Sequence, residues 1–155
     1  MKSMHALTFR LGEEILAIEA GHVREILDPV PVTVVPNASD LAAGLVNVRG
    51  SIVPLADPRV AFGMPLAERT SDTRIVVTEF DIDGEAVVVG ILADQVHDVS
   101  DIETGTTAAV PSVGLTWPPE YVRSIGRSGE HFVLIPDLPA ILFDTGGSQT
   151  AANNR

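Results

Sequence analysis

The chain has 155 residues, of which 45% are hydrophobic, and its formal net charge is −11 from 21 acidic and 10 basic side chains. This length suits one domain or two small intertwined ones with a real hydrophobic core. The acidic excess would repel phosphate groups, which argues against a nucleic-acid binder and against binding to an anionic membrane surface. The absence of cysteine excludes disulfides, thiol catalysis and cysteine-ligated metals. Because we find neither a signal peptide nor an apolar run of about 20 residues, we expect a cytoplasmic protein without membrane insertion.

The first part of the chain predicts short strands separated by turns. Residues 5–11 alternate between apolar and polar side chains, and Gly12 turns the chain into a second strand, which completes a hairpin. Residues 20–27 suit a short helical turn followed by an extended piece. A short strand is expected at 32–35, where nearby prolines force an extended path. A one- or two-turn helix is then expected over residues 37–43.

The middle of the chain predicts a tight hairpin with a charged tip. Gly50 permits the unusual φ angle that such a turn needs, and a two-residue loop would place Val48 opposite Ser51. Arginine is a poor turn former and a good recognition group. Arg49 is therefore either a surface charge paired with a nearby carboxylate such as Asp57, or a guanidinium presented to a partner. The residues alone leave these two interpretations open.

The second half continues the series of strands and turns. Asp57-Pro58 is typical of a helix N-cap followed by a first-turn proline, and the polar residues 63–73 form the best internal boundary. Asp83-Gly84 is a hairpin signal. The expected strands are 74–82, 85–93 with an extension to 102, 120–126 and 131–135. A short helix at 137–143 and a disordered polar tail, 144–155, are expected to end the chain.

The number and spacing of the strands favour a barrel architecture. About nine or ten short strands with turns at ~8–12-residue spacing are typical of barrels rather than an open sheet. Since each half offers about five strands, we expect two small barrels. The first would span roughly residues 14–64 and the second roughly residues 74–135.

No pattern typical of an enzyme or a metal site stands out in the sequence. The four histidines lack the spacing of metal ligands, and no nucleophile motif or phosphate-binding loop is present. The one acidic cluster contains Asp94, His97 and Asp101, and it lacks the calcium-loop pattern. Packing with solvated charges is its simpler interpretation. A small β-barrel enzyme with a site built from these three residues is kept as an alternative.

Six short motifs follow one another in a fixed order along nearly the whole chain. In the first half they are Phe9-x-Leu11-Gly12-x-Glu14, Val23-x-Glu25-Ile26, and Gly44-x-x-Asn47-x-Arg49-Gly50-x-x-Val53-Pro54-x-x-Asp57. In the second half they are Arg74-Ile75-Val76-Val77, Val89-Gly90-Ile91-Leu92-Ala93-Asp94-x-Val96, and Phe132-x-Leu134-Ile135-x-Asp137. With this order and spacing, residues 5–143 resemble the CheW family, the adaptors of bacterial chemotaxis.

The resemblance implies a mainly β fold of two five-stranded SH3-like barrels with short helices and a groove between them. It implies an adaptor without catalysis, cofactor or metal. Such an adaptor joins the regulatory domain of a CheA-type histidine kinase to the cytoplasmic tip of chemoreceptors, and it is recruited to receptor arrays at the inner membrane. A CheW-like adaptor of a non-flagellar pathway, which controls pili or development, is the first alternative.

The resemblance also implies two sets of contact residues. The receptor contacts carry over to Val23, Glu25, Gly44, Arg49, Ile75, Val76 and Gly90. The kinase contacts are expected on the first barrel, at Val32 and Val34. Apolar groove residues would bury the helical tip of the receptor, whereas the charges of Arg49 and Glu25 would set its orientation and register.

Overall fold

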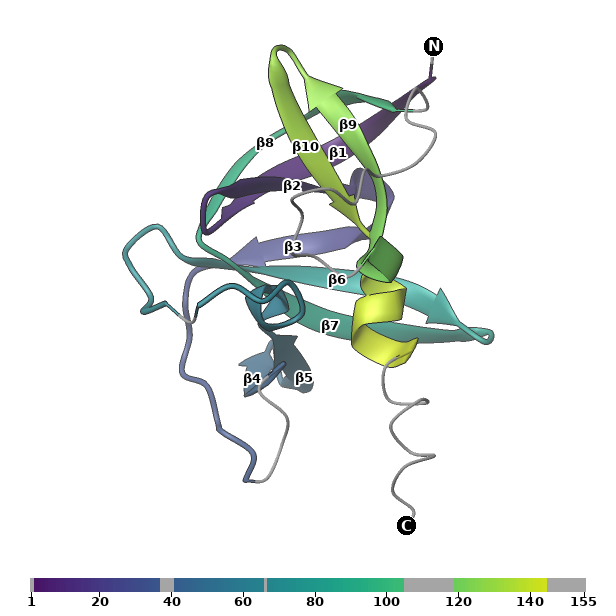
Figure 1. The fold of residues 1–155 in the computed structure, drawn as a ribbon. Helices are drawn as coiled ribbons and strands as arrows, with labels where there is room; N and C mark the ends of the chain where they lie inside the picture. The colour runs from purple at the N-terminus through teal and green to yellow at the C-terminus, as the bar shows by residue number, and fades with distance from the viewer. Residues whose placement is uncertain (1, 37–40, 66, 105–118, 145–155) are drawn as a thin grey trace.

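The computed structural model describes residues 2–36, 41–65, 67–104 and 119–144. Within these residues ten strands form two five-stranded sheets (Figure 1). The strands are β1 (Lys2–Leu11), β2 (Glu14–Glu19), β3 (Val23–Leu27), β4 (Ala42–Val48), β5 (Ser51–Ala56), β6 (Arg74–Ile82), β7 (Glu85–Ala93), β8 (Gln95–Thr104), β9 (Val122–Ser128) and β10 (His131–Pro136). The short helical turns are η1 (Ala20–His22), η2 (Pro58–Val60), η3 (Pro119–Tyr121) and η4 (Ala140–Asp144). The predicted fold, mainly β with two five-stranded units and short helices, is confirmed.

The first sheet closes into a barrel with the strand order β1-β2-β10-β9-β8. β1 and β2 form the hairpin that the alternation of residues 5–11 predicts, with Phe9 opposite Leu16. On its other side β1 pairs with the long strand β8. β10 joins β2 in parallel where Leu134 meets Leu16, so the last strand of the chain closes the barrel against the second.

The second sheet has the order β3-β6-β7-β5-β4. Its centre is the long β6–β7 hairpin, whose predicted turn has positive φ angles at Asp83 (+53°) and Gly84 (+85°). After β3 the chain returns to β4, where the backbones of Thr33 and Leu45 exchange hydrogen bonds of 2.9 and 2.8 Å. This bridge attaches the segment that follows β3 to the edge strand β4. It also replaces the strand predicted at 32–35, because Thr33 alone pairs there.

The two sheets alternate along the chain and do not divide it into halves. β1 and β2 belong with β8–β10, whereas β3–β7 form the second sheet, below the barrel in Figure 1. The predicted barrel boundaries, 14–64 and 74–135, therefore do not follow the sheets. The reason is that strands far apart in sequence pair with each other, as β2 does with β10.

The described residues cover the helix predicted near residue 40 and the predicted tail only in part. The helix expected over 37–43 is wrong at its end, because Ala42 and Ala43 belong to β4. Residues 37–40 of that segment lie outside the described part of the chain, and Leu41 belongs to a turn. The helix expected at 137–143 is present as a shorter turn, η4, and the tail beyond Asp144 lies outside the described part of the chain.

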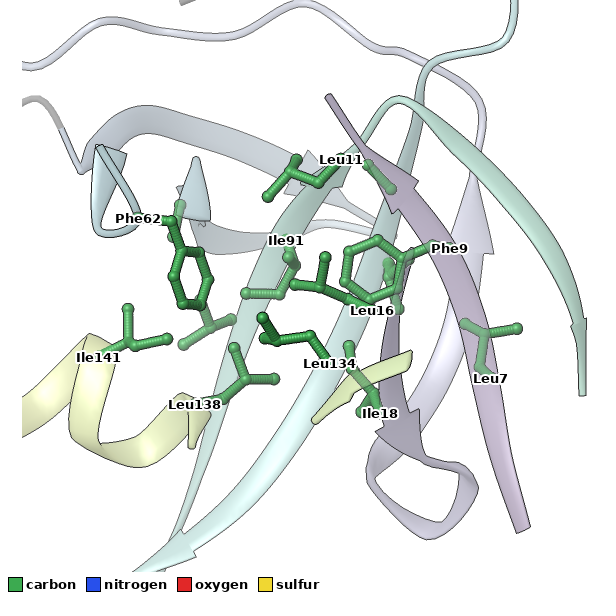
Figure 2. Close-up of a cluster of buried hydrophobic side chains, with 14 of the residues drawn as sticks. Leu7, Phe9, Leu11, Leu16, Ile18, Phe62, Ile91, Leu134, Leu138 and Ile141 are labelled. Atoms are coloured by element: carbon green, nitrogen blue, oxygen red, sulfur yellow. The ribbon is translucent and has the colours of Figure 1, made fainter. Parts of the chain in front are cut away.

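One hydrophobic cluster holds the barrel and the second sheet together. Phe9 and Leu16 from the barrel pack with Ile91 from β7 in the same cluster, and Figure 2 shows these side chains facing one another. Ile141 of η4 and Phe62 cover one side of it. Each subdomain also has a small core of its own. Because burial of apolar surface stabilises by about 25 cal/mol per Å², this shared cluster makes the two sheets one folded unit.

Candidate functional site

The turn between β4 and β5 presents an arginine in a constrained conformation. Arg49 and Gly50 both have positive φ angles, +54° and +87°, as a type I′ turn requires. The side-chain oxygen of Asn47 accepts a hydrogen bond of 2.9 Å from the Gly50 amide. Val48 lies opposite Ser51, which confirms the predicted two-residue loop. The Arg49 side chain is 78% exposed at the tip.

Arg49 forms a two-pronged ion pair with Glu25 on β3. Its Nη2 donates to Oε1 at 2.8 Å and its Nε donates to Oε2 at 3.3 Å. The pair spans the gap between the two ends of the second sheet, because β3 and β4 are its edge strands. The hydrogen bond from Arg49 lowers the pKa of the Glu25 carboxyl below its ordinary value. The predicted alternative pairing of Arg49 with Asp57 is wrong, since Asp57 binds Arg59.

Gly44 and Val23, two further predicted receptor contacts, are less exposed than Arg49. Gly44 is buried in β4 with φ +148°, and a Cβ there would lie 2.5 Å from the Thr33 carbonyl oxygen and from Cγ1 of Val32. Glycine is thus required for the close approach of the two segments. Val23 is half-buried and packs against the shared cluster.

Three of the predicted receptor contacts are buried within the second sheet. Ile75 and Val76 are 1% and 0% exposed, and they pair with Leu27 and Ile26 of β3. Gly90 is buried on β7, where an added Cβ would lie 3.0 Å from Cγ2 of Ile75. The structure therefore does not bring these three residues to the surface beside Arg49.

A hollow lies beside the β4–β5 hairpin, next to a segment that carries exposed apolar side chains. Val34 is 73% exposed and Ile52 is 66% exposed, whereas the neighbouring Val32 is half-buried. The hollow has a volume of about 410 Å³, and its lining includes Val30, Pro31, Thr33 and Ile52 but not Val34. Ile52 is not among the contact residues predicted from the sequence. The hairpin register could have found it, because Ile52 lies opposite the exposed Asn47.

A buried arginine that the sequence analysis also missed lies at η2. Arg59 is 4% exposed, and its guanidinium binds the carboxylates of Asp57 at 3.0 Å and Asp94 at 2.5 Å. Burial acts to lower the pKa of Arg59, but the hydrogen bonds and charges of the two carboxylates outweigh it and raise the pKa above the ordinary value. Asp57 also caps η2 by accepting from the Arg59 amide, with Pro58 in the first turn, as predicted.

The cluster suggested for an enzyme does not form a site. Asp94 is bound to Arg59, His97 is exposed, and Asp101 is exposed and pairs with Nδ1 of His5 at 3.0 Å. Asp94 directly precedes β8 and Asp101 lies within it, so the two residues are roughly 20 Å apart, since a strand rises about 3.3 Å per residue. Among the described residues no group of three or more acidic or histidine side chains could hold a metal ion. The described helices are all too short or too polar to cross a membrane.

The fold and sequence match one protein family over most of their length. The family model of the CheW-like domain matches residues 5–145. The chemotaxis protein CheW of Klebsiella aerogenes is 33% identical over 136 residues, which cover 88% of this chain and 80% of that protein. A probable chemotaxis protein CheW of Rhizobium etli is 25% identical over 139 residues, covering 90% and 87% of the two chains.

A solved structure gives the same match at the level of the fold. The crystal structure of the scaffolding protein TtCheW from Thermoanaerobacter tengcongensis superposes with a TM-score of 0.77 and 26% sequence identity. The superposition covers 91% of this chain and 88% of that one. With the family match over residues 5–145, this shared architecture establishes that the chain belongs to the CheW-like family.

Proposed function

We propose that this protein is a non-catalytic adaptor that couples chemoreceptors to a CheA-type histidine kinase in the cytoplasm, at receptor arrays. Membership of the CheW-like family supports an adaptor role in chemotaxis, as do the names of its relatives, a chemotaxis protein and a scaffolding protein. The observation that carries the proposal is the exposed ion pair of Glu25 and Arg49.

The ion pair is poorly explained by a structural role. An exposed ion pair contributes little to folding stability, and a residue other than glycine with positive φ is conformationally unfavourable. The Arg49 turn has both features. A planar guanidinium held in one orientation is well suited to recognise a carboxylate or backbone carbonyl on a partner. We therefore assign receptor recognition to Arg49 and Glu25, with Val23 and the 42% exposed Ile26 as flanking apolar contacts on β3.

The kinase contact is proposed for the apolar surface around Val34 and Ile52. A partner that covers these side chains gains from their burial, since their exposed apolar area costs free energy in water. Val32 lies beneath this surface and fixes the segment that carries Val34. The receptor and kinase surfaces share no residue, so both partners could bind at once.

The receptor assignment is tested with charge reversals at the ion pair. We expect Arg49→Ala and Arg49→Glu to weaken binding of a receptor-tip fragment by about tenfold or more, with a melting temperature close to that of the unmodified protein. The double variant Glu25→Arg with Arg49→Glu can still form the internal pair, but it presents reversed charges to the receptor. We expect it to bind as weakly as the single variants.

The matched control removes another exposed ion pair of the same sheet. Arg74→Ala removes the contact between Arg74 and Asp28, which is 3.4 Å in length, together with two bonds from Arg74 to the carbonyls of Ser71 and Thr73. It should leave receptor binding unchanged. If the double reversal restored full binding, the pair would serve only to hold the turn, and the recognition role would be wrong.

A pull-down from the native cell, with this protein as bait, would name the kinase and the receptor. It would also separate a flagellar pathway from one that controls pili or development.

A further inference from the structure

Asp94 lies where the chain passes from the second sheet into the barrel, between β7 and β8. Its backbone amide donates a hydrogen bond of 2.9 Å to the carbonyl of Arg10. Its Oδ2 accepts a bond of 2.7 Å from the amide of Gly12, in the turn between β1 and β2. Its Oδ1 accepts the bond from Arg59. One side chain is thus bound to the first hairpin of the barrel and to η2 of the other subdomain.

The hydrogen bonds continue from Arg59 into the second sheet. Nε of Arg59 donates to Oδ1 of Asp57 at 3.0 Å, and the Asp57 amide donates to the carbonyl of Leu41, next to β4, at 2.9 Å. A chain of directional contacts therefore runs from Gly12 in the barrel to the edge strand that carries the proposed recognition turn.

Apolar packing between the subdomains is incomplete beside this chain of contacts. A hollow of about 580 Å³ opens there, and its lining includes Arg10 and Gly12 from the barrel side and Phe62 and Met64 from the η2 side. Arg59 and Asp94 form part of its wall. At this edge of the interface, the polar contacts of Asp94 therefore take the place of continuous side-chain packing.

Elsewhere the interface is formed by the aliphatic and aromatic side chains of the shared cluster. Such surfaces tolerate small shifts in packing, because their contacts are not directional. Buried ion pairs with fixed hydrogen bonds add little net stability, but they can select one geometry. We propose that Asp94 and Arg59 are positioning residues that fix the orientation of the barrel relative to the second sheet. Under the proposed function, on which this part rests, they also connect the barrel to the edge strand β4, which leads to the recognition turn at Arg49.

The orientation can be measured in the free protein. Because the chain has no cysteine, Glu130→Cys in the barrel and Glu85→Cys on β7 give two exposed labelling sites. Electron–electron double resonance between spin labels then reports the distance distribution between the subdomains. Two mild variants are compared. Asp94→Asn retains an oxygen for the Gly12 amide but loses its charge, and Arg59→Lys retains the charge but loses the two-pronged geometry.

The matched control is Thr78→Val, which also removes a buried hydrogen bond. The Thr78 hydroxyl is 0% exposed and donates to the carbonyl of Val89 at 2.8 Å, within the second sheet alone. We expect Asp94→Asn and Arg59→Lys to broaden and shift the distance distribution. Thr78→Val should lower the melting temperature but leave the distance distribution unchanged. An unchanged distance distribution in Asp94→Asn and Arg59→Lys, or equal broadening in Thr78→Val, would overturn the proposal.

Receptor binding gives the second measurement. We expect Asp94→Asn and Arg59→Lys to weaken binding of the receptor-tip fragment by about fivefold or more, although Glu25 and Arg49 are intact. Fivefold is the lower end of typical coupling between two sites. A changed orientation with unchanged affinity would overturn the role in receptor binding. If the unmodified protein bound no receptor fragment, the proposed function would be wrong, and the distance measurement would still decide the role of Asp94 and Arg59.

Discussion

Charged residues of this protein form ion pairs in two different environments. The pair of Glu25 and Arg49 lies at the surface, where Arg49 is 78% exposed, whereas the guanidinium of Arg59 is buried between two carboxylates. Salt screens exposed charges over about 10 Å at moderate ionic strength, but it affects buried pairs much less. Recognition through Arg49 should therefore weaken with added salt, while the contacts of Arg59 should not.

The titration of Glu25 gives a direct test of its pairing. Arg49 lowers the pKa of Glu25, so the folded protein favours the ionised carboxylate. Its small stabilising effect is present above the ordinary pKa of glutamate and is lost as the pH falls through the lowered value. In Arg49→Gln we expect the carboxyl pKa, followed by NMR, to rise toward the ordinary value. An unchanged midpoint in that variant would mean that the ion pair is absent in solution.

Gly44 is expected to be required by sterics and not by contact with a partner. The Cβ of Gly44→Ala would meet the Thr33 carbonyl at 2.5 Å and force β4 away from it. We expect a loss of roughly 1–3 kcal/mol in the free energy of unfolding, measured with denaturant. Gly21→Ala is the control, because nothing lies within 4 Å of its added Cβ. Equal stability of both variants would contradict the role given to Gly44.

At the level of elements, turn chemistry made the hairpins predictable. Asp83-Gly84 and Arg49-Gly50 identify their turns because the φ preferences act within two residues. The pairing of Thr33 with Leu45 and of Leu16 with Leu134 joins residues distant in sequence. No local pattern encodes such contacts, which explains why the barrel boundaries and the strand at 32–35 were predicted incorrectly.

The candidate site was predictable to a similar extent. The motifs identified Glu25 and Arg49, and the structure brings both together. They could not identify the partner of Arg49, since that contact depends on the arrangement of the sheet edges, nor the burial of Arg59. The network at Asp94 was missed because its members come from three separate segments of the chain.

The apolar surface beside the β4–β5 hairpin leads to a prediction about kinase binding. Val34→Ser and Ile52→Ser change side chains that are already 73% and 66% exposed. The unfolding free energy should therefore change by no more than about 0.5 kcal/mol, while affinity for the kinase regulatory domain, measured by calorimetry, should fall. Val99→Ser on β8 is the control, since Val99 is 48% exposed on the barrel. An equal effect of Val99→Ser on affinity would contradict the assigned surface.

For the whole molecule, the shared cluster predicts cooperative unfolding. Ile91 is 0% exposed and packs with side chains of both sheets. Ile91→Ala should cost about 2–5 kcal/mol in the free energy of unfolding. Because the cluster joins both sheets, amide hydrogen exchange should accelerate in β1 and β6 by the same factor. Loss of protection in one sheet only would show that the subdomains unfold independently.

An adaptor must hold its two partners at the same time. The proposed receptor surface around Glu25 and Arg49 and the proposed kinase surface around Val34 and Ile52 have no residue in common. Simultaneous occupancy of these surfaces is the property that separates a coupling protein from one that merely competes for either partner.

The most direct measurement is assembly of the three components, followed by analytical ultracentrifugation. Receptor-tip fragment and kinase regulatory domain are mixed with and without this protein. We predict a ternary complex that contains all three, which Arg49→Glu dissociates from the receptor and Ile52→Ser dissociates from the kinase. If the kinase domain instead displaced the receptor fragment, the two surfaces would not be independent, and the proposed coupling function would be contradicted.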